Sequence, residues 1–299
     1  MFPIIPAASA ADSGNQEGIF GFGTTGSRSA VTNLVSNAGV VATDQAAVTG
    51  DPRDAIAACE YGGDKGIFGY GTGDTTNTTN LVSNTGVVST DVAGVGTARY
   101  GLSACSYGED KGIFGYGDAD GPYTADTNLV SNAGVVSTDV VGVGTARAYS
   151  AACEYGEDKG IFGYGTNSSG SNVSMTNLVS NAGVVATDTT GVGTARDLIA
   201  ACGYGGDKGI FGYGENGGRV SITNLVTNAG VVGTDVTGVG TARHSLAGTQ
   251  YGGDKGIFAY GQDSGVASMS NLVSNAGVVA TDVTGVGSAR RRLAACSFN

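Results

Sequence analysis

A repeat of about 47 residues runs through almost the whole chain, and it limits the folds that the chain can adopt. The string Gly-Ile-Phe recurs at intervals of 46 to 49 residues. The copies begin at Gly18, Gly66, Gly112, Gly160, Gly209 and Gly256. An Asn-Leu-Val string and a Thr-Asp pair follow in every copy. A period of roughly 20–50 residues is typical of solenoids, propellers and arrays of small units.

The pattern inside one copy is that of short strands joined by turns. In the third copy, strands are expected at residues 102–107, 113–117, 127–131 and 135–140. Gly-containing or Asn-containing turns separate the first pair and the last pair, and a polar loop separates the middle pair. No segment has the 3.6-residue apolar period of a helix. Four short antiparallel strands in about 47 residues are typical of one propeller blade.

Six copies therefore predict an all-β fold, a six-bladed β-propeller with four antiparallel strands per blade. We expect residues 1–299 to form a single domain, with a short N-terminal tail at residues 1–14. Residues 291–299 read as an inner strand with no second strand after them, and residues 17–23 read as a second strand without a clear inner strand before them. The C-terminal strand is therefore expected to complete the first blade, which removes the exposed sheet edges of an open array.

The alternation of side chains predicts how neighbouring blades pack. Phe114 and Tyr116 are expected to point to one side of their strand, with Ile113 and Gly115 on the other. Large rings would then pack against the Gly-rich and Ala-rich face of the next blade. This pairing makes 54 glycines compatible with a core in a chain that is 40% apolar.

Residues 51–71 read DPRDAIAACEYGGDKGIFGYG, and this order resembles the kelch-repeat propellers. A kelch unit runs from Pro-Arg through a small apolar inner strand to a Lys-led aromatic strand that ends in paired glycines. The chain departs from that pattern because Gly-Tyr-Gly replaces the paired glycines and Trp is absent. The regular DKGIFGYG, NLVSN and GVVATD strings are also similar to repeats in some tailed-bacteriophage virion proteins.

The net charge of −11 and the absence of a long apolar run exclude two classes of partner. An acidic surface repels phosphate backbones, so nucleic acid is not an expected partner. No apolar run reaches the roughly 18 residues of a membrane span, so membrane insertion is not expected. The apolar residues 1–10 are interpreted as a packed or frayed tail, with a signal peptide as the alternative. The localisation stays unassigned, with a virion or extracellular setting favoured.

Few residues are available for catalysis or metal binding. The chain has one His, and it lacks a nucleophile elbow, a P-loop and a dinucleotide-binding fingerprint. Kelch-like copper oxidases use several His ligands, which this chain cannot supply. We therefore predict no enzyme activity, no catalytic residues, no cofactor and no metal site. A lone acid or base at His244 is the alternative.

Five cysteines occupy the same inner-strand position in five copies, and Thr249 takes the sixth. They are Cys59, Cys105, Cys153, Cys202 and Cys296. The favoured interpretation is a small buried residue where space is tight, with disulfides excluded by the distance between blades. A ring of thiolates that holds a soft metal is the alternative.

An Asp and an Arg also recur in every copy. The Asp residues are Asp44, Asp91, Asp139, Asp188, Asp235 and Asp282, and the Arg residues are Arg53, Arg99, Arg147, Arg196, Arg243 and Arg290. A repeated ion pair or hydrogen-bond network is the favoured interpretation, because the matching charges cancel. A charged rim that binds an anion is the alternative.

Sequence variation among the copies gathers at the second-to-third loops and just after the repeat Arg. In an antiparallel blade these segments lie at the same end, and binding residues often lie on loops of a rigid scaffold. Free drift of long loops is the alternative. The predicted binding residues on this face are Asp74, Tyr100, Asp120, Tyr123, Asn172, Arg219, His244, Asp263 and Arg291.

These features favour a non-enzymatic interaction or structural module that binds a protein partner or a cell-surface glycan through one face. A virion component, such as a tail, fibre or decoration protein, is the setting first expected. The alternative is a lectin-like carbohydrate-binding propeller with repeated sites between its blades. Fold alone does not decide between the two.

Overall fold

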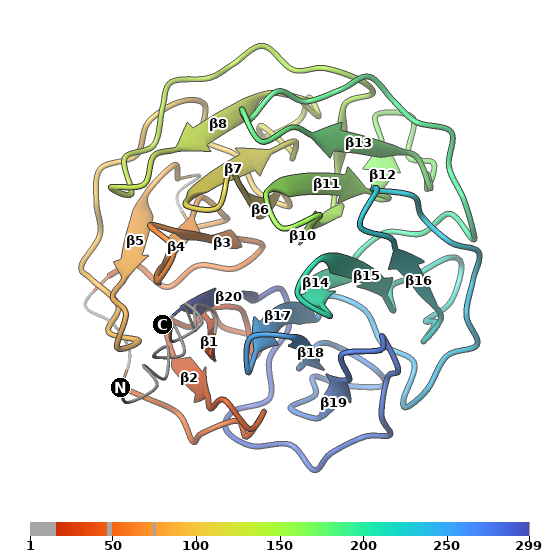
Figure 1. Cartoon of the computed structure of the whole chain (residues 1–299). Coiled ribbons are helices and arrows are strands. Elements are labelled where there is room, and N and C mark those ends of the chain that lie inside the picture. Colours follow the sequence, from red (N-terminus) through yellow and green to blue (C-terminus); the bar gives the residue numbers. More distant parts are fainter. Residues whose placement is uncertain (1–15, 47–49, 74–75, 299) are drawn as a thin grey trace, which may run out of the picture.

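The computed structural model describes residues 16–46, 50–73 and 76–298. Six antiparallel sheets are arranged in a ring around a central axis, and the innermost strand of each sheet borders that axis (Figure 1). This is a six-bladed β-propeller, as the sequence predicts. Blades are numbered here by the order of their second strands in the chain.

Each blade has an inner, a second and a third strand. The inner strands of blades 1 to 6 are β20 (Ala294–Phe298), β3 (Ala57–Tyr61), β6 (Ser103–Tyr107), β10 (Ala151–Tyr155), β14 (Ala200–Tyr204) and β17 (Ala247–Tyr251). The second strands are β1 (Glu17–Gly21), β4 (Lys65–Gly69), β7 (Lys111–Gly115), β11 (Lys159–Gly163), β15 (Lys208–Gly212) and β18 (Lys255–Ala259). The third strands are β2 (Thr32–Val35), β5 (Thr79–Val82), β8 (Thr127–Val130), β13 (Thr176–Val179), β16 (Thr223–Val226) and β19 (Ser270–Val273).

The C-terminal strand completes the first blade, which confirms the predicted closure. β1 lies between β2 and β20, and it pairs with β20 from Glu17 opposite Phe298 to Gly21 opposite Ala294. The two ends of the chain thus share one sheet, and the ring has no open inner edge in its first blade.

The expected fourth strand is not a regular strand. Residues 135–140 form no continuous ladder with β8: they have two isolated bridges, Val130 with Val136 and Thr127 with Val140, and a hydrogen bond from Ser137 N–H to the carbonyl of Leu129. The Asn128 side chain replaces part of the main-chain hydrogen bonding between the two segments, because its Nδ2 donates to the carbonyl of Ser137 at 3.0 Å. The same amide contact recurs in the other blades, so each sheet has three strands and an irregular outer segment.

The prediction that Phe114 and Tyr116 point to the same side of the blade is wrong. Phe114 packs against blade 2, with its ring centroid 5.2 Å from that of Tyr70, whereas Tyr116 packs against Phe162 of blade 4. The two rings therefore lie on opposite faces of the blade. The cause is the backbone at Tyr116, whose φ of 64° ends the strand alternation.

Glycine in the second strand makes room for the neighbouring blade. A Cβ atom at Gly69 would lie 2.8 Å from Cζ of Phe114, so glycine leaves the room that the end of this ring needs. Phe114 is fully buried there. Large-on-small packing between blades is therefore confirmed, but Phe114 packs on the glycine of the preceding blade rather than on that of the next.

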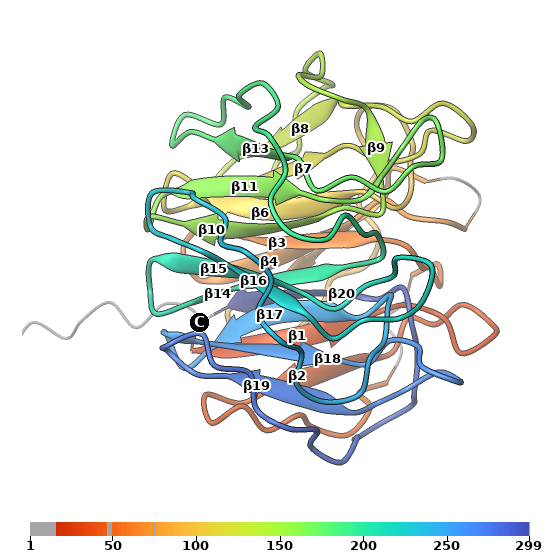
Figure 2. The same cartoon turned by 90° about the vertical axis from the view of Figure 1, so that its right-hand side faces the viewer.

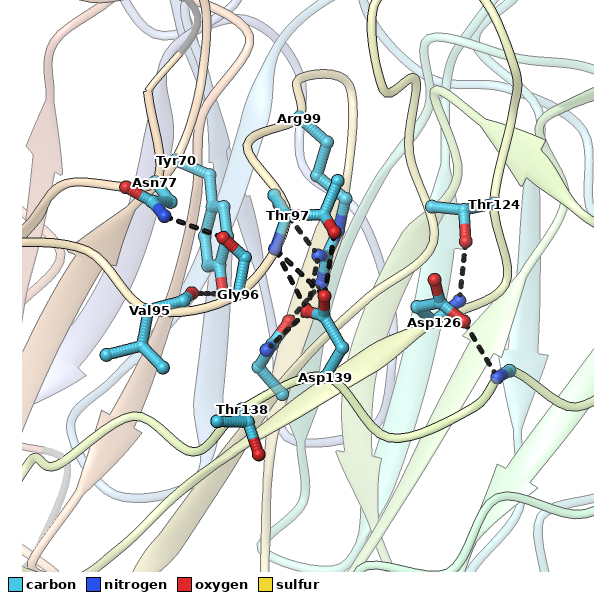
Figure 3. Close-up of polar contacts among 12 residues, drawn as sticks. Tyr70, Asn77, Val95, Gly96, Thr97, Arg99, Thr124, Asp126, Thr138 and Asp139 are labelled. Atoms are coloured by element: carbon cyan, nitrogen blue, oxygen red, sulfur yellow. Dashed lines mark hydrogen bonds and ion pairs between the residues drawn. The ribbon is translucent and has the colours of Figure 1, made fainter.

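The repeated Arg and Asp form a clamp between adjacent blades (Figure 3). Arg99 is fully buried, and its guanidinium carbon lies 4.7 Å from the ring centroid of Tyr70 in blade 2. The same guanidinium donates to Asn128 Oδ1 at 2.5 Å in blade 3. Asp139 of blade 3 accepts hydrogen bonds from Asn128 and from the main chain and hydroxyl of Thr97.

The clamp pairs each Arg with the Asp of the following copy rather than its own. Arg99 Nη1 lies 3.6 Å from Asp139 Oδ1, and Arg243 Nη1 lies 3.9 Å from Asp282 Oδ1. All six Arg side chains lie over an aromatic ring of the preceding blade, at 4.0 to 5.0 Å from its centroid. Their burial leaves no charged rim of these six Arg side chains at the surface.

Candidate functional site

The second-to-third loops and the residues that lead into the inner strands meet at one end of the ring, which we call the varied face. The residue after each repeat Arg bridges to the first residue of a loop. These pairs are Asp54 with Thr72, Tyr100 with Asp118, Ala148 with Thr166, Asp197 with Glu215, His244 with Gln262, and Arg291 with Thr24. In blade 4 the pairing extends to two short strands, β9 (Arg147–Ala148) and β12 (Thr166–Asn167), and Figure 2 shows β9 toward one end of the disc.

The opposite end, which we call the constant face, carries the first-to-second and third-to-fourth turns. In blade 3 these turns meet, because Asn132 Nδ2 donates to Asp110 Oδ2 at 3.0 Å. Main-chain hydrogen bonds also link the turns of successive blades, such as Gly62 N–H to the carbonyl of Asp110 at 2.7 Å. The antiparallel geometry therefore separates the varied loops from the repeated turns, as predicted.

A closed circuit of main-chain hydrogen bonds surrounds the axis at the varied face. The second residue after each repeat Arg donates its N–H to the carbonyl of the equivalent residue in the preceding blade, at 2.6 to 3.0 Å. The residues are Ala55, Gly101, Tyr149, Leu198, Ser245 and Arg292, with Arg292 accepting from Ala55. We call these six residues the mouth ring.

The mouth ring holds its residues in a left-handed conformation. Their φ values lie between 50° and 60°, although only one of the six is glycine. An L-residue in this conformation costs roughly 1–2 kcal/mol. Because each N–H is bonded to the preceding blade, the ring offsets this cost and fixes the direction of five different side chains, with glycine at the sixth position.

A cavity of about 70 Å³ opens at the mouth ring. Its lining is mostly apolar and includes Ile56, Leu102, Leu198 and Ile199. Tyr149 lies on its rim, where a Cβ atom at Gly101 would be 2.8 Å from Cε1 of the Tyr149 ring. The only glycine of the mouth ring thus lies where a neighbouring aromatic ring covers the backbone.

The predicted residues that lead into the inner strands lie around this cavity, but they are less exposed than expected. Tyr100 is half-buried, and its hydroxyl donates to Asp118 Oδ2 at 2.8 Å, which raises the pKa of Tyr100. His244 is only 8% exposed. Its Nδ1 lies 2.9 Å from Ser245 Oγ and its Nε2 lies 3.5 Å from Glu215, while burial lowers its pKa.

Arg291 is half-buried, and its guanidinium donates to the side chain of Gln262 in blade 6. Two arginines nearby approach one carboxylate: Arg28 Nε lies 3.5 Å and Arg292 Nη1 lies 3.9 Å from oxygens of Asp54. The seam between the first and last copies therefore places three arginines on the varied face.

The predicted loop residues differ in exposure. Asp120 and Arg219 are exposed, whereas Tyr123 and Asp263 are half-buried. Asn172 is held between blades, since its Nδ2 donates to the carbonyl of Glu215 at 3.0 Å. Asp74 lies outside the described residues.

Basic residues divide between the two faces. The Lys residues Lys65, Lys111, Lys159, Lys208 and Lys255 all begin second strands at the constant face, and each contacts the Asp before it. The arginines outside the repeat position are Arg28, Arg219, Arg291 and Arg292, and all belong to loops or lead-in segments of the varied face. Positive charge on the varied face is thus carried by arginine alone.

The cysteines pack between blades rather than into an open ring. A Cβ atom at Gly112 would lie 2.5 Å from Sγ of Cys59, so each thiol fills the space beside a glycine of the next blade. All five cysteines are buried and unpaired, and burial raises the pKa of Cys153 to about 12. Among the described residues, no group of three His, Cys, Asp or Glu side chains could hold a metal ion.

A second cavity, of about 90 Å³, lies along the inner strands. Two carboxyl side chains line it, Glu60 of blade 2 and Glu154 of blade 4. Ser297 Oγ donates to Glu60 Oε2 at 3.2 Å. Burial raises the pKa of Glu154 well above its usual range, and the neighbouring Glu60 carboxyl adds to the effect.

Sequence reasoning missed Tyr149, Leu198 and Arg292, although a signal for them was present. The comparison of copies used the first residue after the repeat Arg, but the second residue differs in every copy as well. The left-handed backbone that directs these side chains to the mouth has no sequence marker here, because glycine occurs only at residue 101.

The described part of the chain contains no helix with the length and apolar character needed to cross a membrane. No protein-family model matches the sequence, and a comparison with curated proteins found no match either.

Proposed function

We propose that this chain is a non-enzymatic interaction or structural module that binds one partner through its varied face. The observation that carries the proposal is the mouth ring, in which a sixfold backbone circuit presents six different residues, five of them with a side chain. A rigid scaffold with non-identical groups suits a single partner, because preorganised side chains lose little freedom on binding. The partner is a protein or a cell-surface glycan.

The proposal extends to the setting of the module. The order of residues 51–71 supports a kelch-like propeller, and the regular repeats support a place in a virion, as a tail, fibre or decoration protein. An enzymatic role finds little support, since His244 is mostly buried and its ring nitrogens face Ser245 and Glu215.

A lectin-like function with repeated sites between blades is the second candidate, and two equivalent grooves favour it. One groove, of about 210 Å³, lies between Leu129 and Val140 of blade 3 and the turn at Val184 of blade 4. The other, of about 350 Å³, lies between Leu34 of blade 1 and the turn at Val87 of blade 2. Such sites would bind several ligands per chain.

The test is a variant in which every second-to-third loop is replaced by the loop of residues 262–269. We expect the variant to lose binding to the source particle or cell surface while its melting temperature stays nearly unchanged. The control replaces the five second-strand Lys residues by Glu, which alters only the constant face. Loss of binding in the control alone would show that the partner binds the constant face instead. A glycan array and the saturation stoichiometry test the lectin alternative, which requires several ligands per chain.

A further inference from the structure

We infer that the cavity at the mouth ring is an anchor pocket for one aliphatic side chain of a protein partner, flanked in that partner by an acidic and a basic residue. The inference rests on the proposed function and specifies its ligand. Three observations carry it: the lining of the cavity, the fixed position of Tyr149, and the distribution of charge around it.

The lining favours an aliphatic group over a sugar. Ile56, Leu102 and Ile199 form the buried floor, and Leu198 and Tyr149 lie at its edge. The two serines of the lining already have partners, since Ser150 contacts Ser103 and Ser245 contacts His244. Hydroxyl groups brought onto such a floor would therefore lose water for little gain in hydrogen bonding, which costs about 1–3 kcal/mol each. A dry cavity of about 150 Å³ holds a benzene ring. A space of about 70 Å³ therefore suits the end of a branched aliphatic side chain.

The rim of the pocket is fixed before the partner arrives. The N–H of Tyr149 donates to the carbonyl of Gly101 at 2.6 Å, and its carbonyl accepts from Leu198 at 3.0 Å. The Tyr149 ring covers Gly101, and its centroid lies 6.5 Å from that of Tyr100. Aromatic side chains in desolvated pockets are the usual anchors of protein interfaces.

Charged groups of both signs surround Tyr149, because Arg292 lines the same cavity and the Asp118 carboxylate accepts from the hydroxyl of the neighbouring Tyr100. The pKa of Tyr149 is raised above all by burial, but the positive charge of Arg292 opposes the shift, and the carboxylates of Asp118 and Asp197 add to it. Arg292 belongs to the blade 1 side of the mouth, whereas Asp118 and Asp197 belong to blades 3 and 5. Asp118 is buried, whereas Asp197 is half-buried, so a complementary partner carries an acidic residue toward Arg292 and a basic residue toward Asp197.

The pocket occurs once per chain, because it is centred on the axis and its rim is formed by non-identical residues. The grooves between blades recur, with equivalent residues, between blades 1 and 2 and between blades 3 and 4. The anchor pocket thus predicts one peptide per chain.

The experiment uses the full chain labelled with ¹⁵N and the peptide Ac-Asp-Leu-Lys-NH₂. We expect millimolar peptide to shift the amide signals of Gly101, Tyr149 and Leu198, with one site per chain. Ac-Asp-Ser-Lys-NH₂ should bind about tenfold more weakly, because the aliphatic group is lost. Methyl β-glucoside should leave these signals unchanged.

Two variants and a matched control complete the test. Leu198→Asp should abolish the shifts, since Asp tolerates the left-handed conformation while it places a charge at the pocket edge. Val184→Asp alters a valine that is 64% exposed in a groove between blades, and it should leave the shifts intact. Arg292→Glu should weaken the binding of the Asp-containing peptide but not of Ac-Leu-NH₂.

Equal binding of the Leu and Ser peptides, stronger shifts with the glucoside, or shifts confined to the grooves would overturn the anchor pocket. The same holds if no mouth-ring signal moves with any peptide. These results leave the proposed function standing as long as the loop-replacement variant loses partner binding. If that variant and Leu198→Asp, which alters the mouth ring, both keep the partner, the proposed function fails whatever the peptides do.

Discussion

Arg290 Nη2 donates to Asn33 Oδ1 at 2.6 Å, although the two residues lie 257 positions apart in the chain. Arg290 also donates through Nε to the carbonyl of Phe22, and Ser288 donates to Asp44. These are the contacts of the clamp between blades 2 and 3, repeated where blade 6 meets blade 1. The seam of the ring is therefore closed twice, by the clamp and by the pairing of β20 with β1.

Deletion of residues 291–299 should open this seam. The variant loses β20, which leaves β1 with an unpaired inner edge and exposes the apolar face of blade 6. We expect aggregation or loss of cooperative melting, as judged by size-exclusion chromatography and thermal denaturation. A synthetic peptide of residues 291–298 added in trans should restore part of the melting transition. A truncated chain that stays monomeric with unchanged melting would contradict the closure.

The sequence predicted the architecture because the repeat itself carries it. Six equivalent copies, with an isolated inner strand at residues 291–299 and an isolated second strand at residues 17–23, determine both the number of blades and the closure. The confirmed packing of Phe114 follows from the same reasoning, since a large ring needs a small partner in an ordered interior.

Two local features could not be predicted from the same patterns. The alternation of side chains along a strand assumes a negative φ at each residue. The left-handed backbone at Tyr116 therefore turns its side chain to the opposite face of the blade, and the residue pattern gives no sign of this. The outer segment reads as a strand, but the Asn128 side chain takes part of its hydrogen bonding. The proposed anchor pocket was not predicted for a related reason, because the left-handed backbone at Tyr149 is held by hydrogen bonds between blades.

Phe114→Ala should lower the free energy of unfolding by about 3–5 kcal/mol, because the ring is fully buried against blade 2. Gly69→Ala tests the same contact from the other side. Its Cβ atom would press on the Phe114 ring, and we expect a loss of about 1–3 kcal/mol. Urea denaturation measures both. In the double variant the two losses should not add, since the Phe114→Ala change removes the ring that the new Cβ atom would press on.

Acid should weaken the clamp. Burial opposes ionisation of Asp139, but hydrogen bonds from Asn128 and Thr97 outweigh it, so the pKa of Asp139 lies below its usual value. The unfolded chain, with an Asp pKa of about 3.9, then binds protons first as the pH falls. The clamp's contribution is complete above about pH 4 and is lost as the pH falls through the folded pKa.

The measurement is urea denaturation as a function of pH, with Asp139→Asn as the comparison. The variant should be less stable at neutral pH, because the neutral amide accepts hydrogen bonds less strongly, and its stability should fall less steeply in acid. The pKa values of Asp44, Asp188, Asp235 and Asp282 are lowered in the same way. An unchanged acid slope in the variant would show that Asp139 is not a source of the acid sensitivity.

The five cysteines should be unreactive in the folded protein. Burial raises the pKa of Cys153 to about 12, so almost no thiolate is present at about pH 8. Ellman's reagent should therefore label no thiol until a denaturant is added and should then label all five. Replacement of the five cysteines by Thr should preserve the fold, because Thr249 already occupies the equivalent position with its methyl group beside Gly18. Stoichiometric zinc or copper that is lost in this variant would show instead a metal site.

Glu154→Gln should stabilise the protein at neutral pH. Burial raises the pKa of Glu154 well above its usual value, and the carboxyls of Glu60, Asp158 and Glu157 add to this shift. A carboxyl with a raised folded pKa contributes its full stability below the unfolded pKa of about 4.3, and that contribution is lost as the pH rises through the folded pKa. The amide stays neutral at every pH, so the stability of the variant does not decrease in this way as the pH rises.

The measurement compares the melting temperatures of the variant and the original chain at about pH 4 and about pH 7. The difference should be large at neutral pH and close to zero in acid. Glu109→Gln is the matched control, because Glu109 lies at the equivalent exposed position of the blade 3 turn, and it should change little under either condition. A Glu154→Gln variant that is less stable at neutral pH would mean that the ionised carboxylate has a favourable partner in the central cavity. In that case the charged carboxylate of Glu154 would stabilise the folded propeller at neutral pH rather than destabilise it.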